Sequence, residues 1–316
     1  MHRYITALAA FILIFTLVGV GYLTNYYYNV PLQTEKTIII PKQAKIKDIT
    51  ALLLKDNIIP EAFSFKLLSY INMKQGKFLQ SGEYYFPSGA NIMQVFNKIS
   101  SGERVVRKVT IPEGYTNYQI FALLNGTQGL DGEITTELLD GKLLPETYTF
   151  YYGDTRQSLL NQMQLAQTQF IEKHYTASYF TSSTDAIVLA SIVEKEARIN
   201  EERPIIASVY LNRLKIGMPL QADPTVIYAL ANGKTDFNYI LSRADLTFDS
   251  PYNTYKYGGL PPSPICNPGK ASIIATLNPA TTPYLFFVAD GTSGRHLFSK
   301  DYKEHLGMIK RVKQAS

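Results

Sequence analysis

Two glutamates near the end of an apolar run are the residues of this sequence best suited to acid–base chemistry. In Leu189–Glu202 (LASIVEKEARINEE), apolar residues lead directly to Glu194 and Glu196. A carboxyl group in apolar surroundings has a raised pKa, so it stays protonated near neutral pH and can act as a general acid. The question is which of the two glutamates lies in such surroundings.

The positions of residues around a helix separate the two glutamates. At about 100° per residue, one apolar arc is formed by Val188, Leu189, Ile192, Val193 and Ile199. Glu196 lies near the middle of this arc. Glu194 lies on the opposite face, where Arg198, four residues later, is spaced for an ion pair on an exposed helix surface. We therefore predict Glu196 as the catalytic residue. The alternative is that Glu196 ends a helix and keeps its carboxyl group in water.

The segments around the glutamates predict a helical core that carries long polar loops. Residues 155–175 have the spacing of an amphipathic helix, and the cluster Thr181–Thr184 is suited to cap the next one. We expect that next helix to contain both glutamates and helix to continue through Glu201 to Ile216. The chain beyond Gly217 is rich in Pro and Gly, which favours loops. Loops held on such a core often form a cleft.

The preceding part of the chain repeats one order of elements. In both Thr37–Leu54 and Val109–Leu124, a β-branched strand is followed by a proline, a turn and a helical pattern, and a looser copy begins near Pro87. The pattern predicts small α+β units packed in series. The alternative is that Pro and Gly only mark ordinary strand-to-helix turns.

The first residues predict a membrane anchor. The segment Tyr4–Leu23 carries no charge and is long enough to cross a bilayer as one helix. Arg3 precedes it, no charged residue follows until Glu35, and Tyr26–Tyr28 suit an interfacial belt. These features predict a cytoplasmic N-terminus and an extracytoplasmic remainder. A cleaved signal peptide is the competing interpretation, although the apolar run is long for one.

Composition excludes several classes of function. The 316 residues are 46% hydrophobic and 18% charged, which suits about two domains with real cores. The net charge of +5 comes without dense basic runs interleaved with aromatics, so we expect no nucleic-acid partner. Cys266 is the single cysteine and the sequence has no CxxC or HExxH motif. We therefore predict no disulfide within the chain, no metal and no cofactor.

Several motifs of the chain resemble one known family. In order, they are SIVEKEA (Ser191–Ala197), residues 207–230, LSRADL (Leu241–Leu246), SPYNTY (Ser250–Tyr255), GLPPSPICNPG (Gly259–Gly269) and TPYLFFVADG (Thr282–Gly291). This set resembles the YceG-like family of membrane-anchored endolytic murein transglycosylases, also called MltG. The resemblance covers about Thr37 to the C-terminus. More distant spore cortex-lytic enzymes carry a catalytic glutamate before Ala-Arg, as Glu196 stands here.

The resemblance implies an α+β chain of three parts. They are a cytoplasmic N-terminus with a single transmembrane helix (residues 1–28), a LysM-like α+β subdomain (29–108) and a mixed α+β catalytic domain with a helical core and long polar loops (109–316). Two positions depart from the family pattern: Asp140 precedes Gly141 where Glu is more usual, and Ala197 stands where Thr is usual. The first departure puts any role of Asp140 in doubt.

The implied reaction needs one carboxylate. Glu196 would protonate the bond between MurNAc and GlcNAc and then accept the proton of the 6-hydroxyl, which closes a 1,6-anhydro ring without water. By resemblance, the groups that bind the sugar are Gln221, Asp223, Tyr252, Asn253, Thr254 and, more weakly, Glu146. Those in LQADPT and SPYNTY also fit ordinary turn chemistry. We expect Asn212 to be a helix-packing amide, and Asp290, Ser293 and His296 to form no serine-hydrolase triad.

Three functions remain open. The first is an endolytic lytic transglycosylase that ends the growth of nascent peptidoglycan strands beside the cell-wall synthases. The second is a hydrolase of the same glycan, which would leave reducing MurNAc ends. The third is a non-catalytic peptidoglycan-binding scaffold of the synthesis machinery, anchored in the membrane.

Overall fold

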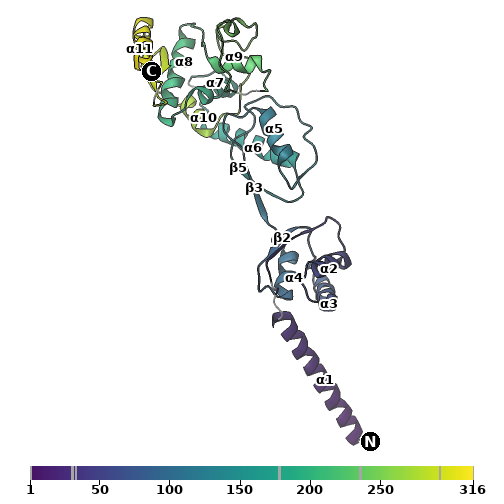
Figure 1. Cartoon of the computed structure of the whole chain (residues 1–316). Coiled ribbons are helices and arrows are strands. Elements are labelled where there is room, and N and C mark those ends of the chain that lie inside the picture. The colour runs from purple at the N-terminus through teal and green to yellow at the C-terminus, as the bar shows by residue number, and fades with distance from the viewer. Residues whose placement is uncertain are drawn as a thin grey trace. The chain divides into compact units, whose positions relative to one another are not determined.

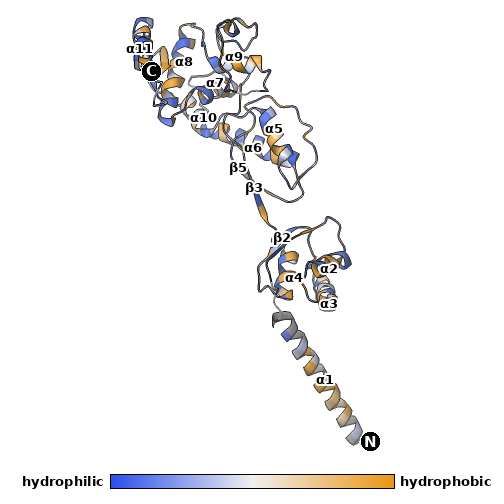
Figure 2. Ribbon diagram, in the orientation of Figure 1, coloured by the Kyte–Doolittle hydropathy of each residue, from blue (hydrophilic) through white to orange (hydrophobic). Residues whose placement is uncertain are grey.

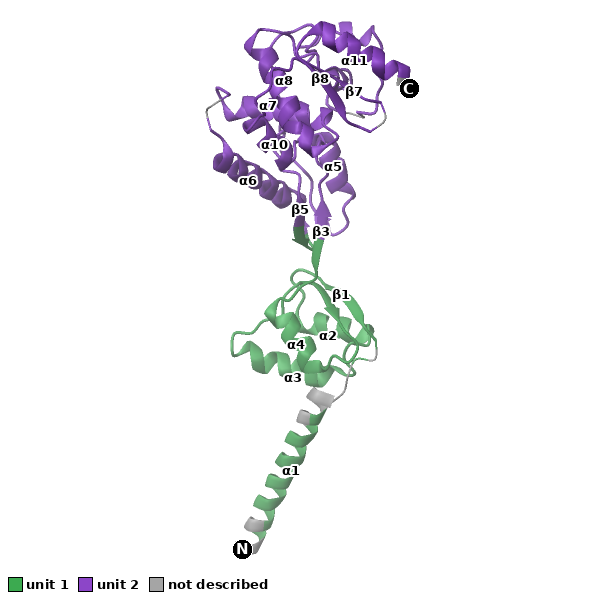
Figure 3. Cartoon of the chain, turned by 90° about the vertical axis from the view of Figure 1, so that its left-hand side faces the viewer, with its two compact units in different colours: residues 1–107, 149–153 green, residues 108–148, 154–316 purple. Residues whose placement is uncertain are grey.

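The computed structural model describes residues 2–29, 32, 34–176, 179–234, 237–291 and 293–315. Its compact units are residues 1–107 with 149–153, and residues 108–148 with 154–316 (Figure 3). We call them unit 1 and unit 2 and describe each by itself. Both are built from helices and two-stranded sheets, so the chain has a mixed α+β fold (Figure 1).

The chain begins with the helix α1 (His2–Asn29), which covers the segment predicted as a membrane anchor. Between Leu8 and Tyr22 its large apolar side chains are exposed, and Figure 2 shows hydrophobic residues along it. Within the described residues, no helix combines the length and apolar character needed to cross a membrane. The side chains of Arg3 and Tyr26–Tyr28, on which the orientation and the aromatic belt were predicted, lie outside the described part.

The rest of unit 1 is a small sheet with helices that share one core. β1 (Lys36–Ile40) pairs antiparallel with β2 (Gly82–Phe86). The helices are α2 (Ile46–Lys55), α3 (Ala62–Met73) and α4 (Ile92–Ser101). The core includes Leu53, Phe65, Tyr84, Val95 and Phe96. The strand–helix copies predicted at Thr37 and near Pro87 are therefore real, but they pack on each other and are not separate units in series.

Local capping explains why these strand–helix copies could be predicted. Asn91 caps α4 by accepting a hydrogen bond from the backbone N–H of Gln94, whose side chain bonds back to Asn91. Thr116 and Gln119 form the same capping box at the start of α5 (Asn117–Gly126). That helix follows β3 (Val106–Thr110), as the second copy predicts.

Unit 2 surrounds one deeply buried helix, α7 (Ser183–Glu196). Its other helices are α5, α6 (Arg156–His174), α8 (Arg203–Lys215), α9 (Asp223–Leu230), α10 (Lys270–Leu277) and α11 (Tyr302–Ala315). The strand pairs are β3 with β5 (Thr147–Tyr151), β4 (Leu130–Asp131) with β6 (Asp154–Thr155), and β7 (Phe286–Ala289) with β8 (His296–Ser299). The boundary between the units passes through β3 and β5.

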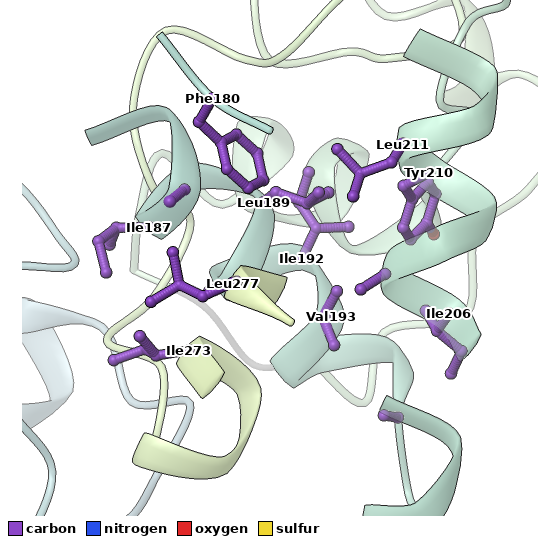
Figure 4. Packing of buried hydrophobic residues seen from close by; sticks show 14 of the residues in the cluster. Phe180, Ile187, Leu189, Ile192, Val193, Ile206, Tyr210, Leu211, Ile273 and Leu277 are labelled. Carbon is purple, nitrogen blue, oxygen red and sulfur yellow. The ribbon is translucent and has the colours of Figure 1, made fainter. Parts of the chain in front are cut away.

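Every residue of α7 from Ala186 to Val193 is buried. Leu189, Ile192 and Val193 pack with residues of α8 and α10 in one core (Figure 4). The prediction of a single apolar arc with an exposed opposite face was therefore wrong. The helix has no solvent-exposed face over this stretch, because neighbouring helices cover it on several sides.

The predicted continuation of helix from Glu196 to Ile216 was also wrong. α7 ends at Glu196, a 3₁₀ turn covers Asn200–Glu202, and α8 begins at Arg203. Pro204 stands in the first turn of α8. A proline there has no N–H to donate, and its ring clashes with the carbonyl group four residues earlier, so it favours a helix start and disfavours a helix interior. The break leaves Glu196 as the last helical residue.

Candidate active site

The carboxyl group of Glu196 meets α8 at the end of α7. The Tyr210 hydroxyl on α8 donates a hydrogen bond to Glu196 Oε1 at 3.0 Å. Tyr210 is 1% exposed and belongs to the core, so its position is fixed by packing. Glu196 itself is half-buried. Part of the residue is therefore exposed at the surface of unit 2.

The surroundings raise the pKa of Glu196 to about 7. Loss of solvent is the largest cause, because the charged form loses more hydration than the neutral one. The hydrogen bond from Tyr210 and the positive charge of Arg213 lower this pKa, whereas the negative charge of Asp223 raises it. A carboxyl group with a pKa near neutral can give up and regain a proton in one catalytic cycle.

Arg213 is held beside this carboxyl group by backbone carbonyl groups. Its Nε donates to the Leu285 carbonyl at 2.7 Å, and its Nη1 donates to the Leu220 carbonyl. The guanidinium carbon lies 5.4 Å from the centre of the Phe286 ring. Burial lowers the pKa of Arg213 from its usual value. With three such contacts, the cation is fixed in place and supplies positive charge near Glu196.

Thr254 joins the two loops that approach Glu196. Its Oγ1 accepts the Ala222 N–H at 2.9 Å and lies 2.9 Å from Thr225 Oγ1, while its carbonyl group accepts the Gln221 N–H at 3.1 Å. This joint brings the next residue, Tyr255, to the start of α9. There the Tyr255 hydroxyl donates to Asp223 Oδ1 at 2.6 Å. Asp223 is thus the second carboxylate close enough to act on Glu196 electrostatically.

The predicted sugar-binding residues fall into different environments. Gln221 is exposed and has a φ of 49°, a left-handed conformation that is uncommon outside glycine. Asn253 is fully buried, and its Nδ2 donates to the Leu246 and Phe248 carbonyl groups at 3.0 and 2.8 Å. Both Asn253 and the buried Thr254 therefore hold the shape of their loop.

The other two predicted residues, Tyr252 and Glu146, make contacts with neighbouring loops and helices. The Tyr252 hydroxyl lies 2.5 Å from Ser263 Oγ, and its ring centre lies 5.0 Å from that of Tyr228. Glu146 forms an ion pair with Lys270 at 2.5 Å, with both side chains partly exposed. Neither contact involves Glu196.

Glu194 is a structural carboxylate, but for a different reason from the predicted one. Its side chain is 7% exposed and pairs with Arg203 at 3.5 Å, and its Oε2 accepts the Gly269 N–H at 3.0 Å. Arg198, the predicted partner, is exposed. Because α7 is covered on this side, Glu194 bonds to α8 and to the start of α10. Its bonds join three helices.

The remaining polar groups agree with the sequence-based interpretation. Asn212 donates to the Thr282 and Tyr284 carbonyl groups at 2.8 and 3.0 Å, which is the role of a packing amide. His296 Nδ1 lies 2.7 Å from Glu202 Oε2, and Ser293 instead bonds to Asp290. The histidine and the serine therefore have different partners and form no triad.

Asp140 is 7% exposed and accepts hydrogen bonds from the Asn117 N–H and, at 2.7 Å, from the Tyr228 hydroxyl. Burial raises its pKa. These bonds connect α5, α9 and the segment before Gly141, so the aspartate stabilises the fold of unit 2.

Sequence reasoning missed three residues around Glu196: Tyr210, Arg213 and Tyr255. Tyr210 and Arg213 are spaced one helical turn apart in ASVYLNRL, and a buried Tyr and Arg at that spacing are a weak signal for a polar site. Tyr255 is the last residue of SPYNTY, the motif from which its three predecessors were selected.

Comparison with known proteins gives consistent matches over most of the chain. Residues 38–311 match the YceG-like family. A Bacillus subtilis (strain 168) protein named endolytic murein transglycosylase is 31% identical over 307 residues, which cover 86% of this chain and 83% of that protein. A protein with the same name from Streptococcus pneumoniae serotype 2 (strain D39) is 28% identical over 85% of this chain, which spans 57% of its length.

A solved structure gives the same result. The crystal structure of a putative yceG-like protein from Listeria monocytogenes superposes with a TM-score of 0.56 at 32% sequence identity. The match covers 87% of this chain and 99% of the other.

Proposed function

The chain belongs to the YceG-like family, and on that premise we propose that it is an endolytic lytic transglycosylase of peptidoglycan with Glu196 as its acid and base. The observation that carries this proposal is the carboxyl group of the half-buried residue Glu196, which has a pKa of about 7 and accepts a hydrogen bond from a buried tyrosine. Near neutral pH such a group exists in both protonation states, which the two halves of the reaction require.

In the first half, protonated Glu196 gives its proton to the oxygen between MurNAc and GlcNAc. The bond from that oxygen to C1 of MurNAc breaks, and C1 gains positive charge in an oxocarbenium-like transition state. The Tyr210 hydroxyl, 3.0 Å from Glu196 Oε1, then stabilises the carboxylate that has formed. Arg213 contributes in the same direction, because its positive charge favours ionised Glu196.

In the second half, Glu196 accepts the proton of the MurNAc 6-hydroxyl while the oxygen of that hydroxyl bonds to C1. The product is a 1,6-anhydroMurNAc end, Glu196 is protonated again, and no water is consumed. Intramolecular attack needs only that the sugar be held in the reactive geometry. Asp223, fixed by Tyr255, supplies negative charge near the cationic sugar, and the exposed Gln221 lies on the same loop and is available to position it.

Mass spectrometry of the released ends tests this proposal. Purified peptidoglycan is incubated with the full chain, and the soluble fragments are analysed. Internal fragments ending in 1,6-anhydroMurNAc are expected. Reducing MurNAc ends would instead identify a hydrolase, and no release by a folded protein would favour the non-catalytic scaffold.

We also propose that the helix α1 anchors the enzyme in the cytoplasmic membrane, with the catalytic unit outside. Support comes from the uncharged segment Tyr4–Leu23 and from the exposed apolar side chains of α1. A helix that is apolar on all sides has no favourable place in water. Alkaline carbonate extraction of cell membranes tests this: retention in the membrane fraction supports an anchor, and release contradicts it.

Two further expectations from the family resemblance belong to the same proposal. Residues 29–108 form a LysM-like subdomain, and cleavage takes place beside the cell-wall synthases, where it ends strand growth. Glycan length in cells tests the second expectation, since loss of the enzyme should lengthen the strands.

A further inference from the structure

A cavity of about 360 Å³ lies in unit 2 away from Glu196. It is lined by α6, by the first turns of α7 and by residues 139–142 and 262–264, and we call it the α6–α7 cavity. Apolar walls come from Leu139, Ile171, Ile187 and two prolines. Its polar lining consists of Asp140, Lys142, Gln164, Gln167, Thr168, Glu172, Ser183, Thr184 and Ser263. This mixture of apolar and polar groups is typical of a ligand site.

Gln167 in the wall of this cavity has an unsatisfied polar atom. The residue is 4% exposed, and its Nε2 donates to the Gly141 carbonyl at 3.0 Å. Among the described residues, its Oε1 has no hydrogen-bond partner. Burying an unpaired amide oxygen costs free energy, so such atoms are rare unless a missing molecule completes them. This oxygen is itself buried, so an N–H group of a bound ligand pairs with it only once the Gln167 side chain turns toward the cavity.

The wall around Gly141 is closely packed, which preserves the shape of the cavity. A Cβ atom at Gly141 would lie 2.6 Å from Pro264 Cγ and 2.8 Å from Ile187 Cγ2. Gly141 also has a φ of 80°, which glycine adopts without strain. A preformed cavity needs little reorganisation to bind a ligand.

The helix α7 connects the cavity to the catalytic carboxyl group. Ile187 lines the cavity and stands nine residues before Glu196 on this helix. At 1.5 Å per residue, the two positions are about 14 Å apart along the helix. The loop of Tyr252 runs between the two sites, because Tyr252 bonds to Ser263 of the cavity and Tyr255 bonds to Asp223 beside Glu196.

We propose that the α6–α7 cavity binds the peptide stem carried by a MurNAc residue of the glycan strand. This inference rests on the proposed function and deepens it by naming a second part of the substrate. An extended chain of four residues spans about 14 Å, which matches the separation along α7. Backbone N–H and carbonyl groups of a peptide suit the amide side chains of Gln164 and Gln167.

The charges at the cavity favour a peptide over a bare sugar. Lys142 and Glu172 are both exposed, and the structure gives neither an ion pair within the described part of the chain. Peptide stems carry carboxylate groups and, in their diamino acid, an amino group, so the two side chains have complementary partners. The sugars of a glycan strand without stems carry no positive charge.

Two glycan substrates test the proposal with the full-length chain. One is a preparation of uncrosslinked strands with their peptide stems, and the other is the same preparation after an amidase has removed the stems. The readout is kcat/KM for the formation of 1,6-anhydroMurNAc ends. The wild-type chain should cleave the peptide-bearing strands about tenfold more efficiently, as expected for one or two hydrogen bonds or ionic contacts.

Thr168→Trp fills the cavity from α6, and Gln162→Trp is its control on an exposed position of the same helix that does not line the cavity. Thr168→Trp should lose the preference for peptide-bearing strands and leave cleavage of stripped strands unchanged, whereas Gln162→Trp should match wild type on both. Lys142→Met, which adds no bulk, should weaken the preference several-fold, so the proposal stays testable if the larger side chain disturbs folding.

Equal wild-type rates on the two substrates would overturn the inference. An equal loss on both substrates in folded Thr168→Trp would also overturn it, since the cavity would then bind the glycan itself. If the wild-type chain forms anhydro ends from neither substrate, that distinct result overturns the proposed function and this inference with it.

Discussion

Replacement of Tyr210 by Phe should shift the pH dependence of cleavage upward. The Tyr210 hydroxyl donates to Glu196 Oε1 at 3.0 Å and thereby lowers the pKa of Glu196. A hydrogen bond to a charged group contributes about 1.5–3 kcal/mol, and one pKa unit corresponds to about 1.4 kcal/mol, so its loss should raise the pKa by about 1–2 units. Because the pKa of Glu196 in the wild-type protein is about 7, its pKa in the variant should lie near 8–9, about 1–2 units higher.

Because Glu196 must be protonated to start the reaction, kcat/KM should fall as the pH rises through its pKa in the free enzyme. The wild-type midpoint is expected near pH 7, and the Tyr210→Phe midpoint should lie higher. On the acidic side, where Glu196 is protonated in both proteins, the variant should be about tenfold slower, because the carboxylate formed in the transition state has lost one donor. The ratio of variant to wild-type rate should therefore rise with pH.

Asp223→Asn is the matched variant, and it should shift the pKa of Glu196 in the opposite direction. The negative charge of Asp223 raises the pKa of Glu196, so its removal should move the midpoint below that of wild type. Initial rates of anhydro-end formation from pH 5 to pH 9 on one peptidoglycan preparation give all three profiles. An unchanged or lower midpoint in Tyr210→Phe, or shifts of both variants in one direction, would refute the electrostatic account of Glu196.

Three further predictions concern stability. The pKa of Glu196 rises from 4.5 to about 7 on folding, so ionising it opposes folding increasingly between these pH values. Glu196→Gln should thus leave Tm unchanged below this pH window. At pH 8 it should raise Tm, because the free energy of unfolding increases by at most about 3 kcal/mol. Glu194→Gln should lower Tm, because weaker hydrogen bonds to Arg203 and to the Gly269 N–H cost about 1–3 kcal/mol, while kcat of the folded enzyme persists. Gly141→Ala should lower the urea midpoint, because its φ and the close contacts with Pro264 and Ile187 oppose a Cβ atom and cost about 1–3 kcal/mol of unfolding free energy. An unchanged midpoint would show that the wall yields.

Features encoded over a few residues could be predicted from the sequence. The strand–helix copies around Pro41 and Pro112 were confirmed, and the capping boxes of α4 and α5 are complete within four residues each. Asn212 was correctly interpreted as a packing amide, because polar side chains inside a buried helix must find backbone partners. In each case the feature depends on residues close in sequence or on the secondary structure of its own element.

Features that depend on tertiary packing were missed. Glu194 bonds to the N–H of Gly269, 75 residues later, and no local spacing indicates that contact. The helical wheel assumed that α7 has a solvent-exposed face, whereas α8 and α10 cover it. Likewise, Tyr255 reaches Asp223 because Thr254 joins two loops about 30 residues apart in the chain. Only the folded chain could identify the residues that set the pKa of Glu196.

The most direct test of the central claim compares Glu196→Gln with Glu194→Gln. Both variants remove one carboxylate from the same helix and preserve side-chain volume, and circular dichroism establishes that each is folded. Anhydro ends released from purified peptidoglycan are then quantified by mass spectrometry. Our account predicts that Glu196→Gln releases none above background and that folded Glu194→Gln releases most of the wild-type amount. Anhydro-end formation by Glu196→Gln at a rate close to wild type would contradict it.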